Sequence, residues 1–190
     1  MLSQILHFLL DTVFGFFVFV LLARFYLQLM RAPFRNPLGQ FVTALTNWLV
    51  LPARRVIPGM FGLDLASMFL AWLIEALLLF LLYVLKGGSI GAVSGVVVGV
   101  FFSLALLELA RFSLYLLIGV ILVQAVISWV NPYAPLAPLF NALTGPFLSP
   151  FRRLIPPIGN VDLSPLFALV AAQLLLIPLE DLTRSVATLL

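Results

Sequence analysis

The sequence predicts an all-α, polytopic helical membrane protein built from two tandem repeats. The 190 residues are 64% hydrophobic and only 9% charged, with a mean hydropathy of +1.23, whereas a soluble domain carries about a quarter charged residues. The chain contains several apolar runs that are long enough to cross a bilayer. A segment rich in proline and arginine also occurs twice, at a spacing of 98 positions, and each copy lies between two such runs.

The two copies of this segment align without a gap. Residues 48–67 read WLVLPARRVIPGMFGLDLAS, and residues 146–165 read PFLSPFRRLIPPIGNVDLSP. Both contain the pattern P-x-R-R-x-I-P-x5-D-L. The duplication predicts a repeated unit that consists of a span, a Pro/Arg interfacial loop with a short helix, and a second span.

The first repeat is expected over residues 1–86. Its spans are predicted at about 5–30 and 65–85, with an interfacial loop over 31–63. The apolar stretch at 36–51 inside the loop is short, which is typical of an interfacial or re-entrant helix rather than a span. No cleavage site follows the first apolar run, so this run is expected to stay in the membrane.

The second repeat is expected over residues 111–190. Its two spans and its interfacial loop are predicted at about 112–130, 164–183 and 131–163. In the final span, Pro178 is expected to introduce a kink, because proline removes a helical hydrogen bond.

A Gly-rich apolar linker helix is expected over residues 87–110, between the repeats. Its central part, residues 90–107, has three alternatives: it crosses the membrane, dips in and returns, or extends the following helix. The repeats are parallel if this part makes no net crossing, and inverted if it crosses once. The positive-inside rule favours parallel repeats, because both arginine loops then face the cytoplasm.

The paired arginines of each motif are the candidate docking residues: Arg54, Arg55, Arg152 and Arg153. Guanidinium groups at headgroup depth suit bidentate contacts with phosphate. The loops are expected to be ordered, because several residues restrict the backbone there: Asn36, Pro37, Pro52, Pro58, Pro150 and Pro156. Two compatible interpretations stay open, a positive-inside anchor and a docking surface for anionic lipid or a protein partner.

Asp64 and Asp162 precede the second span of each repeat. A carboxylate at this position caps the first amides of a helix and favours its dipole. The same aspartates are alternatively partners of the motif arginines. Ser164 is expected as an N-cap, with Pro165 at the first helical position.

Polar residues within spans are costly and usually face a partner. Arg24 and Glu75 are predicted to form an ion pair between the two spans of the first repeat, with an ion or proton path as the alternative. The repeat alignment places Gln124 and Gln173 at the corresponding positions, which predicts a hydrogen-bonded neutral pair.

The remaining polar residues indicate no catalytic site. The chain has no cysteine and a single histidine, His7, so no metal ligand set and no cofactor is expected. Glu108 and Arg111 are spaced i, i+3 and are expected to pair on one helix face. Asp11 is expected as a polar end group of the first span. The basic residues cluster in loops, which indicates membrane topology and not nucleic acid binding.

Several short motifs together resemble the YggT family, also called YlmG, a group of small bacterial and plastid membrane proteins. The matching stretches are NP at 36–37, PARRVIP at 52–58, Asp64, SWVNP at 128–132, PFRRLIP at 150–156 and DLSP at 162–165. The resemblance implies roles in osmotic stress tolerance and, in other members, in cell division, plastid nucleoid organisation and cofactor assembly on membrane cytochromes. It implies no catalytic chemistry.

The resulting hypothesis is a non-enzymatic organising or assembly factor of the bacterial inner membrane. Its partners would be the lipid bilayer, anionic lipid and membrane proteins, and a homo-oligomer stays open. The alternative is a small ion channel or transporter in the osmotic-stress response. The first loop carries four arginines, whereas no Lys or Arg precedes the first span. This asymmetry predicts an outside N-terminus and cytoplasmic arginine loops.

Overall fold

The computed structural model describes residues 1–57, 59, 63–89, 94–155 and 162–189. These residues form helices and connecting turns, with no extended strand among them. The helices are α1 (Leu2–Leu29), α2 (Pro37–Ala53), α3 (Leu65–Leu85), α4 (Gly95–Val130), α5 (Ala137–Leu154) and α6 (Ser164–Ala187). The prediction of an all-α protein is confirmed.

Four of these helices, α1, α3, α4 and α6, are long and apolar enough to cross a membrane. A helix needs about 20 mostly apolar residues to span the hydrocarbon core, and the shortest of the four, α3, has 21. The chain is therefore a multi-pass membrane protein. The short helices α2 and α5, with 17 and 18 residues, connect the members of each long pair.

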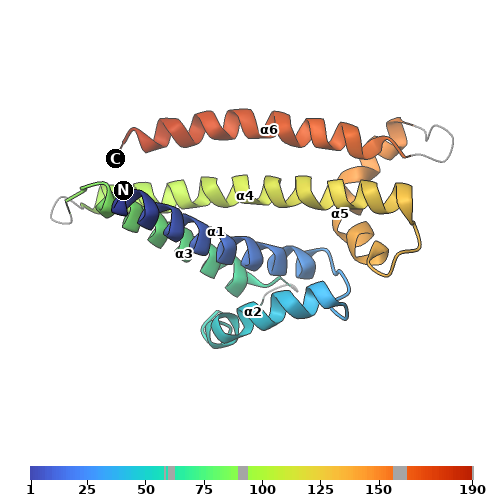
Figure 1. The fold of residues 1–190 in the computed structure, drawn as a ribbon, viewed down its shortest axis with the longest axis horizontal. Helices are drawn as coiled ribbons and strands as arrows, with labels where there is room; N and C mark the ends of the chain where they lie inside the picture. The colour runs from blue at the N-terminus through green and yellow to red at the C-terminus, as the bar shows by residue number, and fades with distance from the viewer. Residues whose placement is uncertain (58, 60–62, 90–93, 156–161, 190) are drawn as a thin grey trace.

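The long helices pack as two antiparallel pairs, α1 with α3 and α4 with α6, and α3 joins the pairs through its contact with α4. Figure 1 shows both chain termini at one end of the long helices. The chain passes through α2 and α5 at the other end, where each short helix contacts both members of its own pair. The two arginine motifs therefore lie toward the same end of the molecule.

The continuous helix α4 decides between the alternatives for the segment at 90–107, as far as that segment is described. Residues 95–107 extend the following helix and do not form a separate element. A helix of 36 residues rises about 54 Å, which exceeds a hydrocarbon core of about 30 Å. A single long helix thus leads from the end of α3 to the second short helix.

Three apolar clusters stabilise this arrangement. The largest joins α1 and α3 through residues such as Leu21 and Ala71, and it includes Leu109 of α4. A second cluster joins α1 and α2 to Phe140 of α5. The third joins α4, α5 and α6 around Leu148. Val50 of α2 in the first cluster and Leu148 of α5 in the third fix each short helix against its own pair of long helices.

The arginine motifs begin inside the C-terminal ends of the short helices, so less of the predicted interfacial loops is irregular than expected. Pro52 lies inside α2, and Arg54 is the C-cap of that helix. Pro150 lies inside α5, and both Arg152 and Arg153 belong to its last turn. Basic side chains interact favourably with the negative end of a helix dipole, so the carbonyl ends of α2 and α5 suit the arginines.

Asn36, expected only to shape the loop, is the N-cap of α2. Its side-chain oxygen accepts a hydrogen bond from the Gly39 amide at 2.9 Å, and Pro37 occupies the first helical turn. Its side-chain nitrogen also donates to the carbonyl of Pro33. Two other prolines proposed to shape the loops, Pro58 and Pro156, lie outside the described residues.

Candidate functional site: two aspartate–arginine junctions

Asp64 is the centre of a buried polar junction that ties α1, α2 and α3 together. Its Oδ2 accepts hydrogen bonds from Arg54 Nη2 at 2.7 Å and from Arg24 Nε at 3.2 Å. The Ser67 hydroxyl donates to the same oxygen at 2.7 Å, and the Ser67 amide donates to Oδ1 at 3.3 Å. Asp64 thus caps α3, as predicted, and it also pairs with arginines from two other elements.

Arg24 reaches the junction from within α1 and also contacts α2. Its Nη1 donates to Thr46 Oγ1 at 2.6 Å and to Asn47 Oδ1 at 2.9 Å. The Arg24 side chain is only 5% exposed, and the Asp64 side chain is 1% exposed. A buried guanidinium of this kind needs both a counter-charge and acceptors for its remaining N–H groups. The junction supplies both.

Arg54 closes the junction on the side of α2. Its Nε donates to Asp64 Oδ1 at 3.2 Å, so the arginine contacts both carboxylate oxygens. Its Nη2 also donates to Gln28 Oε1 of α1 at 3.1 Å. This fork geometry is the strong bidentate form of an arginine–carboxylate pair. The first arginine of the motif therefore has a structural contact within the protein.

The ionisation of Asp64 follows from its surroundings. Burial by itself would raise the pKa of Asp64, but hydrogen bonds from Arg54 and Ser67 and the positive charge of Arg54 hold the pKa below its ordinary value of 3.8. Hydrogen bonds to the charged form and a nearby opposite charge both favour ionisation. The junction therefore contains a carboxylate anion and two guanidinium cations at neutral pH.

Asp162 forms the corresponding junction in the second half of the chain. Its Oδ2 accepts a hydrogen bond from Arg152 Nε at 2.8 Å, and its Oδ1 accepts one from the Ser164 amide at 2.9 Å. The Trp129 indole also donates to the Asp162 carbonyl at 3.3 Å. Burial would raise the pKa of Asp162, but the hydrogen bonds from Ser164 and Arg152 lower the pKa overall.

Gln124 takes the place of Arg24 in this second half. It is buried in α4, and its Nε2 donates to Asn141 Oδ1 of α5 at 2.7 Å. Its Oε1 is buried without a hydrogen-bond partner. In both halves a polar side chain of the first long helix therefore bonds to the short helix. The first half uses a cation for this contact, and the second half uses an amide.

The predicted pair between Arg24 and Glu75 is wrong. Arg24 lies five residues before the end of α1, so the antiparallel helix α3 meets it near its first residues. Glu75 lies ten residues beyond the start of α3, which corresponds to about 15 Å of rise. Asp64, immediately before α3, is the carboxylate at the depth of Arg24.

The predicted pair between Gln124 and Gln173 is also wrong, for a related reason. Gln173 is exposed on α6, nine residues beyond the start of that helix. Gln124 is buried against α5 instead and bonds to Asn141.

Ser164 is not the N-cap of α6. The N-cap is Leu163, and Ser164 is the first helical residue. The Ser164 hydroxyl is buried without a hydrogen-bond partner. Asp162 performs the capping role, because its side chain accepts the hydrogen bond from the Ser164 amide.

The second arginine of each motif differs from the first. Arg55 and Arg153 are exposed, and among the described residues neither forms an ion pair with an acidic side chain. Arg54 and Arg152 bind the aspartates. The R-R pair thus combines one structural arginine with one arginine that faces outward.

The other polar expectations have separate outcomes. Glu108 and Arg111 form the predicted i, i+3 pair, with 2.8 Å between Glu108 Oε2 and Arg111 Nη2. Asp11 lies in the third turn of α1, further from the helix start than an end group. In the described part of the chain, no three His, Cys, Asp or Glu side chains are placed to hold a metal ion.

Sequence reasoning did not identify Thr46, Asn47 and Asn141, the acceptors on the short helices. Thr46 and Asn47 lie about two turns before Arg54, so helical periodicity would have placed Thr46 on the face that includes Val50 and Arg54. Their partners in the long helices depend on how the helices pack, which the sequence does not specify.

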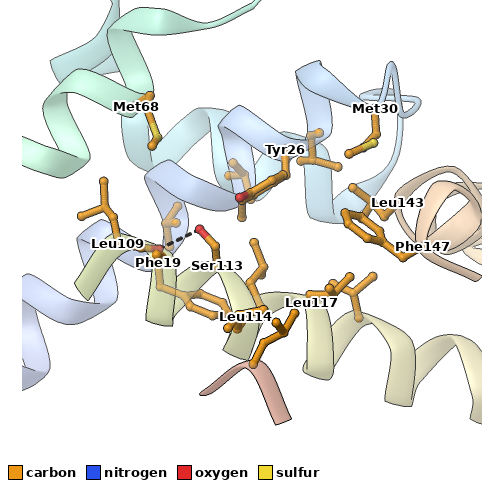
Figure 2. Close-up of a pocket in the computed structure, with 18 of the residues that line it drawn as sticks. Phe19, Tyr26, Met30, Met68, Leu109, Ser113, Leu114, Leu117, Leu143 and Phe147 are labelled. Atoms are coloured by element: carbon orange, nitrogen blue, oxygen red, sulfur yellow. Dashed lines mark hydrogen bonds between the residues drawn. The ribbon is translucent and has the colours of Figure 1, made fainter. Parts of the chain in front are cut away.

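An apolar groove of about 950 Å³ lies between the two halves of the molecule. Figure 2 shows Phe19 and Tyr26 of α1 facing Ser113, Leu114 and Leu117 of α4 across it. The Ser113 hydroxyl donates to the Leu109 carbonyl at 2.7 Å, so its polar group is satisfied within its own helix. The lining suits hydrocarbon and offers no acid–base or nucleophilic set.

Comparison with known proteins places this architecture in a family. The model of the CCB3/YggT family matches residues 3–85 and 103–182. A Pseudomonas aeruginosa protein, PA0392, is 42% identical over 171 residues, which cover 88% of this chain and 84% of that protein. The YggT protein of Escherichia coli K12 is 31% identical over 189 residues, which cover 97% of this chain and 94% of that protein.

A Vibrio alginolyticus protein encoded in the proC 3' region is 35% identical over 170 residues, which cover 88% of this chain and 89% of that protein. The names of these relatives state no enzymatic activity. No solved structure matches the chain. The matched segments include both aspartate–arginine junctions and most of each long helix. The chain belongs to the CCB3/YggT family.

Proposed function

We propose that this chain is a non-enzymatic organising factor of the bacterial inner membrane that binds anionic phospholipid at its arginine-bearing end. The proposal rests on the different environments of the two arginines in each R-R pair: the first pairs with an aspartate, and the second has no acidic partner in the described structure. Arg54 and Arg152 hold the short helices to the spans through Asp64 and Asp162. Arg55 and Arg153 are left exposed at the same end of the molecule, where headgroup phosphates are the natural counter-charge.

The distribution of charge supports this assignment and the orientation. Seven of the ten basic residues lie near the short helices, together with only two of the seven acidic residues, Asp64 and Asp162. Cytoplasmic segments of membrane proteins carry an excess of Lys and Arg. The short helices and their arginines are therefore assigned to the cytoplasmic face, with the N-terminus outside.

The apolar lining of the groove suits an acyl chain of the same lipid. Met30 lines the groove, and Arg31 follows it directly with an exposed side chain. A phospholipid with a chain in the groove would place its phosphate near Arg31, at the depth of the arginine motifs. By retaining anionic lipid at this end, the protein would organise the surrounding membrane and contribute to the osmotic-stress tolerance that the family resemblance implies.

Native mass spectrometry of the purified protein in detergent tests the proposal. Phosphatidylglycerol and phosphatidylcholine are titrated separately, and the number of bound lipids is counted. Removal of two surface cations by Arg55→Gln with Arg153→Gln should weaken phosphatidylglycerol binding. A loss of about 1 kcal/mol for each residue corresponds to roughly 25-fold in the dissociation constant. Phosphatidylcholine binding should change much less.

The matched control is Lys86→Gln with Arg184→Gln, which removes the same charge at the opposite end of the bundle. Lys86 follows α3, and Arg184 lies in the last turn of α6. This control should retain phosphatidylglycerol binding. Equal weakening by both double variants would show a response to net charge alone and contradict a site at the arginine motifs. Unchanged lipid binding with loss of a cross-linked membrane protein would favour protein docking instead.

A further inference from the structure

Four carboxylates, one from each long helix, gather toward the end of the bundle that holds the chain termini. They are Asp11 of α1, Glu75 of α3, Glu108 of α4 and Glu180 of α6. Electrostatic interactions link Glu75 to Asp11 and Glu108, and link Glu108 to Asp11 and Glu180. This group lies away from the aspartate–arginine junctions and has no part in the lipid-binding proposal.

Two of the four carboxylates have a basic partner. Glu108 pairs with Arg111 at 2.8 Å, and Glu180 pairs with Arg184 at 3.7 Å. Asp11 is exposed at the surface of α1. Glu75 alone among the four is both buried and without an ion pair in the described structure. The negative charge in this group therefore exceeds the positive charge that the neighbouring side chains supply.

Glu75 is the member that this imbalance affects most. It is only 3% exposed, and its Oε2 is buried without a hydrogen-bond donor. An ionised carboxylate without a donor in an apolar, membrane-embedded position is costly, and nearby negative charges increase that cost. A neutral carboxylic acid removes both penalties.

We propose that Glu75 is a membrane-embedded proton-binding site whose carboxyl group carries a proton at neutral pH. The charged groups that face it are Asp11 from α1 and Glu108 and Arg111 from α4. Arg111 is committed to Glu108 by its 2.8 Å contact, so it offers Glu75 only partial compensation.

A proton fits this site better than a metal ion. Within the described ranges, no three carboxylates converge closely enough to coordinate a metal. A divalent cation such as calcium takes six to eight oxygen ligands. The single unsatisfied oxygen of Glu75 instead matches the one bond that a bound proton needs.

Infrared spectroscopy of the purified protein in an ester-free detergent tests this proposal. The wild-type spectrum at neutral pH should contain the carbonyl-stretch absorption of a protonated carboxylic acid in an apolar environment. Glu75→Gln, a neutral substitute of similar shape, should remove this absorption while the helical content is retained. The wild-type absorption should also disappear as the pH is raised, in step with deprotonation.

Glu180→Gln is the matched control, because Glu180 has a basic partner and is partly exposed. This variant should keep the absorption. A wild-type spectrum without a protonated-acid absorption at neutral pH would overturn the proposal without the need for any variant. Persistence of the absorption in Glu75→Gln, or its loss in Glu180→Gln, would assign the proton to another carboxyl group and would also overturn it.

Discussion

The two aspartate–arginine junctions have the same plan but differ in depth. In the first half, Asp64 is 1% exposed and binds both Arg54 and the membrane-embedded Arg24. In the second half, Asp162 is 23% exposed, and Arg152 is 43% exposed. We attribute the deeper burial of Asp64 to one position, where α1 has Arg24 and α4 has the corresponding Gln124. A cation inside a span requires a fully buried counter-charge, whereas an amide requires only a hydrogen bond.

The comparison indicates that the conserved plan within this chain is a connection between a short helix and the start of the next span. The first half adds a second, buried cation to this plan, Arg24. In both halves the first arginine binds the aspartate, and the aspartate caps or orients the following helix. The second arginine remains exposed in both halves, which leaves it available for an external phosphate.

Removal of the Asp64 carboxylate should have the largest effect on stability. In Asp64→Ala, Arg24 would remain buried without its counter-charge, and Ser67 would lose its acceptor. Loss of one partner of a buried ion pair typically costs about 3–5 kcal/mol. The free energy of unfolding is measured by chemical denaturation of the purified protein in detergent.

Asp162→Ala is the matched comparison for this variant. Its arginine is partly exposed and can be solvated by water, so the expected loss is about 1 kcal/mol, mostly from the lost helix cap. Equal losses for the two variants would contradict the assigned difference in depth. Arg24→Gln combined with Asp64→Asn should recover part of the loss, because no buried guanidinium then lacks a counter-charge.

The dependence of stability on pH should show a smaller effect, shared by both junctions. Asp64 and Asp162 have pKa values below the ordinary value of 3.8, so their ionised forms stabilise the folded state. This contribution is fully present above the unfolded-state pKa of about 3.9. It is lost as the pH falls further through the lower folded-state pKa.

Asp162→Asn offers the clearest test of this dependence, because the variant should remain folded. The free energy of unfolding, measured at several values below about pH 4, should fall less steeply with decreasing pH than in the wild type. A slope equal to that of the wild type would show that Asp162 contributes nothing to acid sensitivity.

The parts of this fold that depend on composition and local signals could be predicted from the sequence. The span at 65–85 is observed as α3 over Leu65–Leu85, because an apolar run between an aspartate cap and a glycine stop has little ambiguity. The short helix after Asn36 was likewise indicated by its apolar stretch at 36–51, and it is observed as α2 over Pro37–Ala53. The motif prolines were expected to restrict the backbone of a loop, and the structure places Pro52 and Pro150 inside α2 and α5.

The partners of the buried polar residues could not be predicted, because they depend on helix rotation and relative depth. Arg24 and Glu75 are both charged and both within spans, which suggested a pair. Their positions along antiparallel helices differ by several turns, and that distance separates them. Gln173 illustrates rotation, since it aligns with buried Glu75 yet is exposed on α6.

The most direct test of the account is whether both arginine motifs reach the cytoplasmic face. The chain has no cysteine, so single cysteines can be introduced at Val56 and at its counterpart Leu154, which are 82% and 78% exposed. A cysteine at Ser89, between α3 and α4, reports on the opposite face.

Each variant is treated with a membrane-impermeant thiol reagent in intact cells and in opened membranes. The account predicts that the cysteine at Ser89 reacts in intact cells, whereas those at Val56 and Leu154 react only after the membranes are opened. Reaction of the Val56 and Leu154 variants from opposite sides would contradict parallel halves with a shared cytoplasmic lipid-binding end.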